Sequence, residues 1–326
     1  MKKLFLGLDT SNYTTSAAVC DEDGRILLNR KKLLPVKEGE RGLRQSDAVF
    51  HHVRAMEETA EAMREIRRET AGNITAVGCS VAPRDAEGSY MPCFLVGSGV
   101  GRMASAVLDV PLYSFSHQAG HMMAAAYSAC EKHGLVLSEW INKPFLAFHI
   151  SGGTTDIIHT TPDAEKILQA ERIGGTLDIN AGQLIDRLGV KMGLPFPCGA
   201  AMDTMAVAHK EKVPKAPVTV KELSCNLSGL ENKALQLLEE TDNNKPVVSK
   251  YVLHAVAMTL LKLTENLEKA YPDLPILYAG GVMSSRYVRP YLEPHGMFAD
   301  AVYASDNAAG TALLTAESWR RGAEHG

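Results

Sequence analysis

The chain has 326 residues, of which 45% are hydrophobic and 22% charged, and its formal net charge is −4. This composition is typical of a soluble globular protein, and the length allows two domains with a sizeable buried core. The slightly acidic balance excludes a global positive field that would draw the protein onto nucleic acid, so any RNA substrate must bind locally.

The cysteines are scattered and include no CxxC pair: Cys20, Cys79, Cys93, Cys130, Cys198 and Cys225. This pattern predicts buried, reduced thiols rather than a zinc ribbon or a disulfide framework. Asp9 follows the first apolar run too closely for a signal peptide, and no apolar run approaches the ~20 residues of a membrane span. We therefore expect a cytoplasmic protein with no membrane association.

The first apolar runs predict a β-meander. Strands at Lys3–Leu8 and Ser16–Cys20 flank a loop rich in hydroxyls, and a third strand covers Arg25–Leu28. Such a loop can present Ser11 and backbone N–H groups to a phosphate, although the same pattern also occurs in simple turns. The next predicted elements are a helix over Ser46–Ala71, a strand over Ile74–Val81 and a glycine-rich helix over Cys93–Leu108.

A strand over Val110–Phe115 leads into an Ala- and Met-rich helix that ends near Cys130, with Ser116 as its N-cap. His117 and His121 are four residues apart, so both imidazoles project from one face of that helix. The spacing suits two ligands on one divalent metal, with a third ligand from elsewhere. The alternative is a pair of histidines with purely structural contacts.

The hydroxyl-rich hairpin recurs about 140 residues later. After a strand over Phe145–Ile150, Ser151 falls on Ser11, and Thr154-Thr155 falls on Thr14-Thr15. A single repeat at this period predicts two related domains. Actin-like and sugar-kinase-like ATPases hold phosphates between two such hairpins, so we expect an α/β two-domain actin-like ATPase fold with a nucleotide and metal cleft. The expected domains are residues 1–112 with 308–326, and residues 113–307 with an inserted subdomain at about 195–250.

The second half ends in glycine-rich and acidic turns. Gly280 and Gly281 close a strand over Ile276–Val282 ahead of a helix expected near Ser284, which would place an adenosine or a phosphate at a helix N-terminus. Asp306 is expected at the start of the last helix. The remaining predicted elements are a helix over Asn180–Lys191, a long amphipathic helix over Lys250–Ala270 and a strand over Ala301–Ala304.

Six segments occur in an order that resembles one family. They read HQAGH, SGGTTD, GGTLDINAGQLID, NLSGLEN, AGGVMSSR and SDNAAG. Together they resemble the tRNA threonylcarbamoyladenosine synthase family (TsaD, glycoprotease-like) from about Leu4 to Ala316. The resemblance implies a transfer in which a tRNA adenosine attacks the carbamoyl carbon of a threonylcarbamoyl-adenylate and AMP leaves.

The resemblance also implies site residues and partners. His117, His121 and Asp306 would bind a divalent metal, with iron, zinc or manganese suited to this donor set. The adenine nucleotide or acyl-adenylate would contact Ser151, Gly152, Gly153, Gly182, Asp186, Gly280 and Gly281. The implied partners are tRNA, other tRNA-modification subunits, and a family paralogue or a second copy in a dimer.

The chain departs from the family where charged groups are expected. The substituted positions are Tyr13, Thr14, Thr154, Ile179, Gln183, Glu231 and Ser285, and the Gly-Pro-Gly of the loop around residues 83–89 is missing. Glu231 stands where the family has a lysine, and Ser285 where it has an asparagine. The pattern is typical of a divergent paralogue that keeps the binding scaffold, with Thr154 and Asp156 as its candidate catalytic residues.

Three functions remain open. The first is the tRNA-modifying transferase, whose RNA surface would be the basic run Arg25, Arg30, Lys31, Lys32, Lys37, Arg41 and Arg44, unless that run is only a solvated face. The second is a non-catalytic nucleotide-binding partner of an active family member. The third is a carbamoyl or phosphoryl transferase for a small metabolite, with Asp156 as general base. A metalloprotease is not favoured, because Gln118 stands where HExxH has its glutamate.

Overall fold

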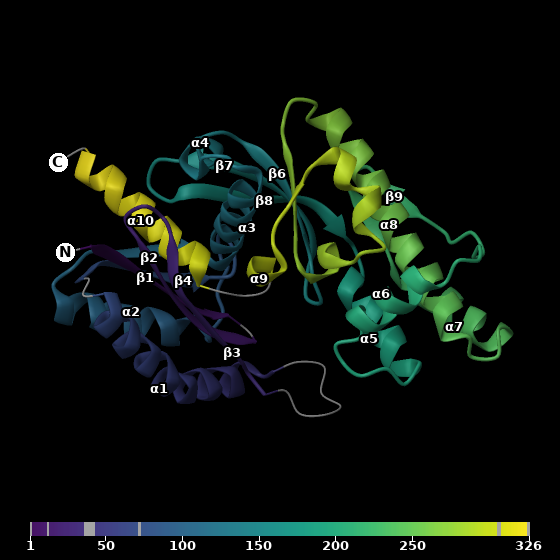
Figure 1. Cartoon of the computed structure of the whole chain (residues 1–326), viewed down its shortest axis with the longest axis horizontal. Coiled ribbons are helices and arrows are strands. Elements are labelled where there is room, and N and C mark those ends of the chain that lie inside the picture. The colour runs from purple at the N-terminus through teal and green to yellow at the C-terminus, as the bar shows by residue number, and fades with distance from the viewer. Residues whose placement is uncertain (1, 12, 36–42, 71–72, 305–307, 325–326) are drawn as a thin grey trace. The chain divides into compact units, whose positions relative to one another are not determined.

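The computed structural model describes residues 2–11, 13–35, 43–70, 73–304 and 308–324. The chain divides into two compact units (Figure 1). Unit 1 contains residues 1–143, 160–170 and 306–326, and unit 2 contains residues 144–159 and 171–305. Unit 1 thus continues past the boundary expected at residue 112, because the helix that carries the histidines packs within unit 1.

Unit 1 is built on a five-stranded sheet of order β3-β2-β1-β4-β5. The first three strands form the predicted antiparallel meander, and β4 and β5 continue the sheet parallel to β1. The strands are β1 (Lys3–Ser11), β2 (Thr14–Asp21), β3 (Ile26–Leu33), β4 (Asn73–Ala82) and β5 (Leu112–Ser116). Because β1 and β2 extend further than expected, only residues 12 and 13 lie between them.

Helices cover both faces of this sheet (Figure 1). Helix α10 packs against β1, β2 and β4, where a Cβ at Gly7 would lie 2.4 Å from the Ala312 backbone nitrogen. On the other face α1 buries Ala48, His52 and Ala55, whereas Val53, expected on the apolar face, is exposed. The helices are α1 (Gln45–Thr70), α2 (Phe94–Leu108), α3 (His117–His133), α4 (Leu137–Ile141) and α10 (Ala309–Glu324).

Unit 2 repeats the strand order of unit 1. Its sheet has the order β12-β11-β6-β7-β8-β10-β9, so the five strands β8-β7-β6-β11-β12 correspond to β3-β2-β1-β4-β5. The strands are β6 (Phe145–Ile150), β7 (Thr155–Asp163), β8 (Ile167–Thr176), β9 (Thr219–Lys221), β10 (Ser224–Asn226), β11 (Ile276–Ala279) and β12 (Met297–Phe298). The shared topology accounts for the sequence repeat and confirms the two-domain α/β fold class.

The region expected as an inserted subdomain belongs to the unit 2 sheet and core. Strands β9 and β10 extend the sheet, and Met202, Cys225 and Leu230 pack in the same hydrophobic cluster as Phe148 of β6. The helices are α5 (Ala181–Lys191), α6 (Gly199–Ala208), α7 (Ser228–Glu240) and α8 (Lys245–Ala270). Helix α8 is long and apolar enough to cross a membrane, but 67% of its apolar window is buried within the protein, as in a core helix.

Two predicted elements were wrong. No α-helix begins near Ser284 in the described part of unit 2; 3-10 turns cover Gly281–Ser284, Arg289–Tyr291 and Glu293–His295. Pro290 and Pro294 lack the N–H donors that a continuing helix requires. Residues Ala301–Ala304 form the short helix α9 instead of a strand, and Asp300 Oδ1 accepts a hydrogen bond of 2.9 Å from the Val302 N–H at its start.

Candidate nucleotide and metal site

Helix α3 begins where the sequence predicts. Ser116 has an extended conformation, and its Oγ accepts a hydrogen bond of 3.1 Å from the Ala119 N–H, which makes it the N-cap. The same hydroxyl donates to Asp85 Oδ2 at 2.7 Å, and Asp85 also pairs with Lys166 at 3.3 Å. Asp85 of the loop at residues 83–89 therefore helps to fix the start of the helix that carries the two histidines.

His117 and His121 converge, as their spacing predicts. Their Nε2 atoms lie 2.9 Å apart, and Nδ1 of His117 lies 3.1 Å from each carboxylate oxygen of Asp9. Asp9 is 1% exposed. The carboxylate accepts the Nδ1–H of His117 and leaves the Nε2 lone pair directed at His121. Two ring nitrogens at this separation share a proton or a cation, so the pair fits two ligands of a divalent metal.

The third expected ligand, Asp306, lies outside the described residues. The described residues contain no group of three or more metal-binding side chains. Helix α10 begins at Ala309, and a Cβ at Gly310 would lie 1.8 Å from the Gly120 carbonyl oxygen. The backbones of α3 and α10 therefore meet beside His121, three residues along the chain from position 306.

The first hairpin is tied to two helices by its paired threonines. Thr10 Oγ1 donates to the Cys93 carbonyl at 2.9 Å and accepts from the Gly97 N–H at 3.0 Å. Thr15 Oγ1 lies 2.7 Å from Nδ1 of His52, which is fully buried on α1. Ser11 Oγ is buried and has no hydrogen-bond partner among the described residues, so the expected phosphate contact stays a prediction.

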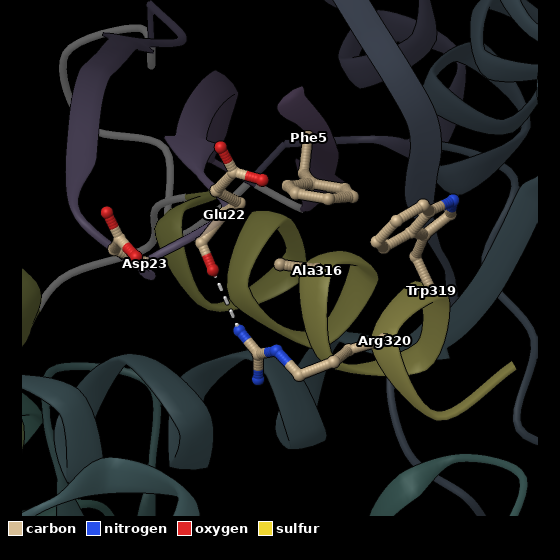
Figure 2. A pocket seen from close by; sticks show the side chains of 6 residues that line it. All are labelled: Phe5, Glu22, Asp23, Ala316, Trp319 and Arg320. Atoms are coloured by element: carbon tan, nitrogen blue, oxygen red, sulfur yellow. Dashed lines mark hydrogen bonds between the residues drawn. The ribbon is translucent and has the colours of Figure 1, made fainter. Parts of the chain in front are cut away.

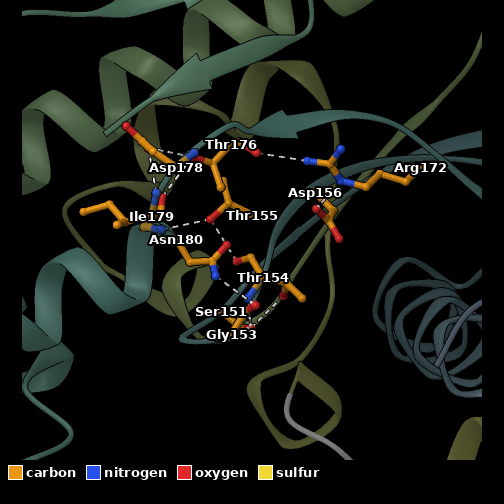
Figure 3. Close-up of polar contacts among 11 residues, drawn as sticks. Ser151, Gly153, Thr154, Thr155, Asp156, Arg172, Thr176, Asp178, Ile179 and Asn180 are labelled. Atoms are coloured by element: carbon orange, nitrogen blue, oxygen red, sulfur yellow. Dashed lines mark hydrogen bonds and ion pairs between the residues drawn. The ribbon is translucent and has the colours of Figure 1, made fainter. Parts of the chain in front are cut away.

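The second hairpin turns its serine inward (Figure 3). Ser151 Oγ accepts from the N–H groups of Gly153 at 3.3 Å and Thr154 at 3.2 Å, and it lies 2.7 Å from Thr154 Oγ1. Gly152 and Gly153 are exposed, and a Cβ at Gly153 would meet no atom within 4 Å. The loop thus keeps an open backbone surface of the kind that binds phosphate.

The first turn of helix α5 packs against this loop. A Cβ at Gly182 would lie 2.6 Å from the Ser151 carbonyl oxygen, so only glycine permits the approach, and the Gly182 N–H donates to that oxygen at 3.2 Å. Asn180 Nδ2 donates to the Gly153 carbonyl at 2.9 Å (Figure 3). The structure therefore brings together Ser151, Gly153 and Gly182, which lie far apart in the sequence.

Asp186 and the glycine turn lie beside the same loop. Asp186 Oδ1 accepts from the Cys198 N–H at 2.8 Å, and its Oδ2 lies 4.0 Å from a Cβ built at Gly152. Burial raises the pKa of the Asp186 carboxyl, and the Cys198 hydrogen bond opposes the shift. Gly280 has φ of +102°, and a Cβ there would lie 2.2 Å from the Ile150 carbonyl oxygen. All the expected nucleotide residues of unit 2 thus gather at the end of β6.

The candidate catalytic residues differ in their surroundings. Thr154 belongs to the loop and bonds to Ser151. Asp156 is 5% exposed, and its Oδ1 accepts a hydrogen bond of 2.6 Å from Arg172 Nε, while Arg172 Nη2 donates to the Thr176 carbonyl at 3.1 Å (Figure 3). Asp156 therefore enters any reaction as one half of an ion pair.

Several acids of the site were not predicted from the sequence. Asp178 accepts the N–H groups of Leu227 at 2.8 Å and Ser228 at 3.0 Å, which fixes the start of α7. Burial raises the pKa of Asp178, but these hydrogen bonds and that of the Ser228 hydroxyl outweigh it and hold the pKa below its usual range. Asp203 accepts from Ser285 Oγ at 2.6 Å and from Arg286 Nε at 2.9 Å, which fixes the turn after Gly281.

A cavity of about 310 Å³ in unit 1 contains none of the predicted site residues (Figure 2). Arg320 crosses it and donates from Nη2 to the Glu22 carbonyl at 3.0 Å. The cavity is lined by Phe5, Glu22, Asp23, Ala316, Trp319 and Arg320. The histidine pair of unit 1 and the loop after β6 of unit 2 are therefore described as separate candidate sites, and this cavity belongs to neither.

Comparisons with known proteins support the resemblance. Residues 44–313 match the sequence profile of the tRNA N6-adenosine threonylcarbamoyltransferase family (TsaD). Relatives with that name include the Neorickettsia sennetsu protein, 25% identical over 98% of this chain and 94% of its own. The Pyrobaculum calidifontis protein is 28% identical over 98% of this chain and 89% of its own.

Solved structures show the fold. T. kodakarensis HypF matches with a TM-score of 0.59 and 11% identity over 98% of this chain and 48% of its own. The Acidaminococcus fermentans (R)-2-hydroxyglutaryl-CoA dehydratase component A matches with a TM-score of 0.53 and 14% identity over 98% of this chain and 99% of its own. Both have the actin-like ATPase architecture. The chain belongs to the tRNA N6-adenosine threonylcarbamoyltransferase family, as a divergent member.

Proposed function

We propose that this protein transfers a threonylcarbamoyl group from its adenylate to the N6 amine of a tRNA adenosine. The observation that carries the proposal is the Asp9–His117–His121 arrangement, in which a buried carboxylate aligns one imidazole so that two Nε2 atoms converge at 2.9 Å. The family to which the chain belongs provides the reaction class. The open loop after β6 provides the place for the phosphate of the adenylate.

The donor set fits a divalent metal such as iron, zinc or manganese. His117 and His121 would hold it, and Asp306 would complete the set from the chain just before α10. A bound metal would act as a Lewis acid that polarises the carbamoyl oxygen or neutralises charge on the leaving phosphate. Asp9 would hold the His117 ring in the ligating tautomer.

The nucleotide would be held by backbone more than by charge. Gly152 and Gly153 would approach the phosphate, and Asp186 would accept a ribose hydroxyl. Gly280 and Gly281 would line the adenine side. Because the N–H groups of Gly153 and Thr154 already bond to Ser151, that hydroxyl keeps the loop in shape before the nucleotide arrives.

Thr154 and Asp156 remain the proposed catalytic residues. Thr154 lies at the mouth of the loop, where its hydroxyl can reach a phosphate or carbamoyl oxygen. Asp156 would act together with Arg172, since Asp156 is buried and its Oδ1 lies only 2.6 Å from Nε of the partly exposed Arg172. Asp156→Asn would remove the carboxylate charge, whereas Arg172→Gln would remove only its cationic partner, so comparing the two variants separates a base from a structural ion pair.

The test is a reconstituted transfer. Purified protein would be incubated with threonylcarbamoyl-adenylate, metal and unmodified tRNA, with and without tRNA-modification subunits, and the nucleosides analysed by mass spectrometry. We expect the modified adenosine with the wild-type protein and none with His121→Ala. A folded, metal-loaded protein that yields no modified adenosine in any combination would exclude the proposal.

One observation favours a second function, a non-catalytic nucleotide-binding partner of an active family member. Glu231 occupies a family lysine position, is 7% exposed and pairs with Arg187 Nη2 at 3.0 Å. Position 231 thus carries an acid whose charge is neutralised by Arg187, in place of a lysine that could bind an anion. On this alternative the protein would bind adenine nucleotide and form a heterodimer with the active member, yet support no transfer alone, which affinity capture with size-exclusion chromatography would detect.

A further inference from the structure

The loop between α5 and α6 exposes an aromatic ring to solvent. Phe196 is 75% exposed, which is more than any other aromatic side chain among the exposed large hydrophobic residues of the described chain. A ligand that covers this ring would gain the free energy of apolar burial. Single exposed hydrophobic side chains are common on protein surfaces, so the role of Phe196 depends on the groups around it.

The loop is held in place by contacts at both ends. After Gly193, which has φ of +71°, the Leu194 N–H donates to the Gly189 carbonyl at 2.9 Å. At the other end the Cys198 N–H donates to Asp186, and a Cβ at Gly189 would lie 2.2 Å from Cys198 Cβ. Phe196 is thus presented by an anchored loop, which lowers the entropy lost when a ligand stacks on it.

The same helix holds the phosphate loop and the Phe196 loop. Gly182 contacts Ser151 in the first turn of α5, and Gly189 contacts the Phe196 loop near its end. At a rise of 1.5 Å per residue these positions are about 10 Å apart along the helix. The two loops are thus anchored about 10 Å apart along α5, so a strand whose target base lies at the phosphate loop can extend toward the Phe196 loop.

Two lysines without acidic partners lie near Gly193, at the start of the Phe196 loop. Lys191 is the last residue of α5, and Lys245 Nζ lies 4.0 Å from a Cβ built at Gly193. Within the described residues neither lysine forms an ion pair, whereas the nearby Arg187 pairs with Glu231. An exposed ring on a loop that begins beside two uncompensated cations offers the base stacking and phosphate contacts through which proteins bind single-stranded nucleic acid.

We propose that the loop of residues 193–199, with Lys191 and Lys245, binds a single-stranded segment of the RNA acceptor. Phe196 stacks on an unpaired base close to the target adenosine, and the two lysines contact the flanking phosphates. The inference rests on the proposed RNA-modifying function and adds the surface that positions its substrate. It also explains how a chain of net charge −4 can bind RNA, through a local patch.

Fluorescence anisotropy with a labelled stem-loop RNA that carries an unpaired adenosine tests the ring. Stacking is worth ~1–3 kcal/mol per base, so Phe196→Ala should weaken binding ~10-fold. Phe196→Trp should restore the affinity. Phe50→Ala is the matched control, because Phe50 is also an exposed aromatic (57%) but lies on α1 of unit 1, and it should bind like the wild type.

The lysines are tested by the salt dependence. Each lost phosphate contact on a single strand lowers the slope of log K against log salt by ~0.7, so the double variant Lys191→Gln/Lys245→Gln should lower it by ~1.4. Lys132→Gln, an exposed lysine of α3, should leave it unchanged.

Nucleotide binding and tRNA modification, measured in parallel, distinguish the failures. Wild-type RNA affinity in Phe196→Ala with normal modification would overturn this inference alone. Loss of adenine-nucleotide affinity in Phe196→Ala with unchanged RNA affinity would also overturn it, since the ring would then contact the mononucleotide. A wild-type protein that neither binds nor modifies RNA would overturn the proposed function and this inference with it.

Discussion

The two hairpins of this protein share a sequence pattern but use their hydroxyls in opposite ways. In the first, Thr10 and Thr15 bond outward to α2 and to His52 of α1. In the second, Ser151 bonds inward to the N–H groups of its own loop and leaves Gly152 and Gly153 exposed. The first hairpin is therefore a rigid support, and the second is an open surface for a ligand.

The difference assigns a separate task to each hairpin. The first hairpin holds Asp9 against His117 and so sets the direction of the imidazole lone pair. The second hairpin holds backbone groups ready for phosphate and relies on Gly182 to keep helix α5 close. Variants in the first hairpin should therefore change metal binding, and variants in the second should change nucleotide binding.

The largest effect should come from His121→Ala. Removing one of two converging imidazoles should lower metal affinity by more than ~100-fold and abolish transfer. Mutating residues that only hydrogen-bond to metal ligands already lowers metal affinity by ~10–100-fold. Metal analysis of the purified protein and a nucleotide titration check this. Nucleotide affinity measured without metal should stay within about twofold of wild type, and a parallel loss of both would contradict the separation of tasks.

Asp9→Asn should come next. The amide keeps the shape of the side chain but can turn an N–H donor toward His117 Nδ1, which favours the wrong tautomer. We expect metal affinity to fall ~10–100-fold with an unchanged melting temperature. Asp21→Asn, a buried carboxylate at the far end of β2, serves as the control. Equal metal binding by Asp9→Asn and wild type would mean that Asp9 does not orient the ligand.

Gly182→Ala probes the second hairpin. The new Cβ would lie 2.6 Å from the Ser151 carbonyl oxygen, so the loop or α5 must shift. Overpacking of this kind costs ~1–3 kcal/mol of unfolding free energy. Nucleotide affinity should fall as well, while metal content remains. Gly229→Ala on α7 is the matched control, because a Cβ at Gly229 would meet no atom within 4 Å. This variant should have a neutral or slightly stabilising effect in thermal unfolding.

The smallest effect concerns acid and His52. Burial lowers the pKa of His52, with the Ser11 carbonyl and Asp9 opposing the shift. His52 therefore binds a proton below pH ~6.5 in the unfolded chain but not in the folded protein. The free energy of unfolding thus falls as pH decreases through that range, by up to ~1.4 kcal/mol per pH unit.

His52→Gln should be less stable at pH 7.5 but show a shallower loss between pH 6.5 and pH 5, measured by denaturant unfolding at each pH. His254, whose pKa burial also lowers, remains in both proteins and provides the common background. An identical pH slope in the variant and the wild type would exclude His52 as the source of the acid sensitivity.

The spacing of residues in the sequence was enough to predict those features that lie within one helix or one loop. The four-residue spacing of His117 and His121 and the small residues after β6 needed no tertiary information. The Asp9–His117 contact spans 108 positions, and the Thr15–His52 contact joins a strand to a helix, so neither leaves a local signal. The prediction of a helix near Ser284 was wrong. The Gly280-Gly281 turn is present, but the two prolines that follow it restrict the chain to short 3-10 turns.

The ion pair between Arg187 and Glu231 limits how this protein could evolve back toward its relatives. Lysine at position 231 alone would replace the Glu231 carboxylate, which lies 3.0 Å from Arg187 Nη2, with an ammonium group that faces the same guanidinium, so two cations would repel at a position whose own side chain is buried. The effect of this substitution therefore depends on position 187: lysine becomes tolerable only after Arg187 has changed.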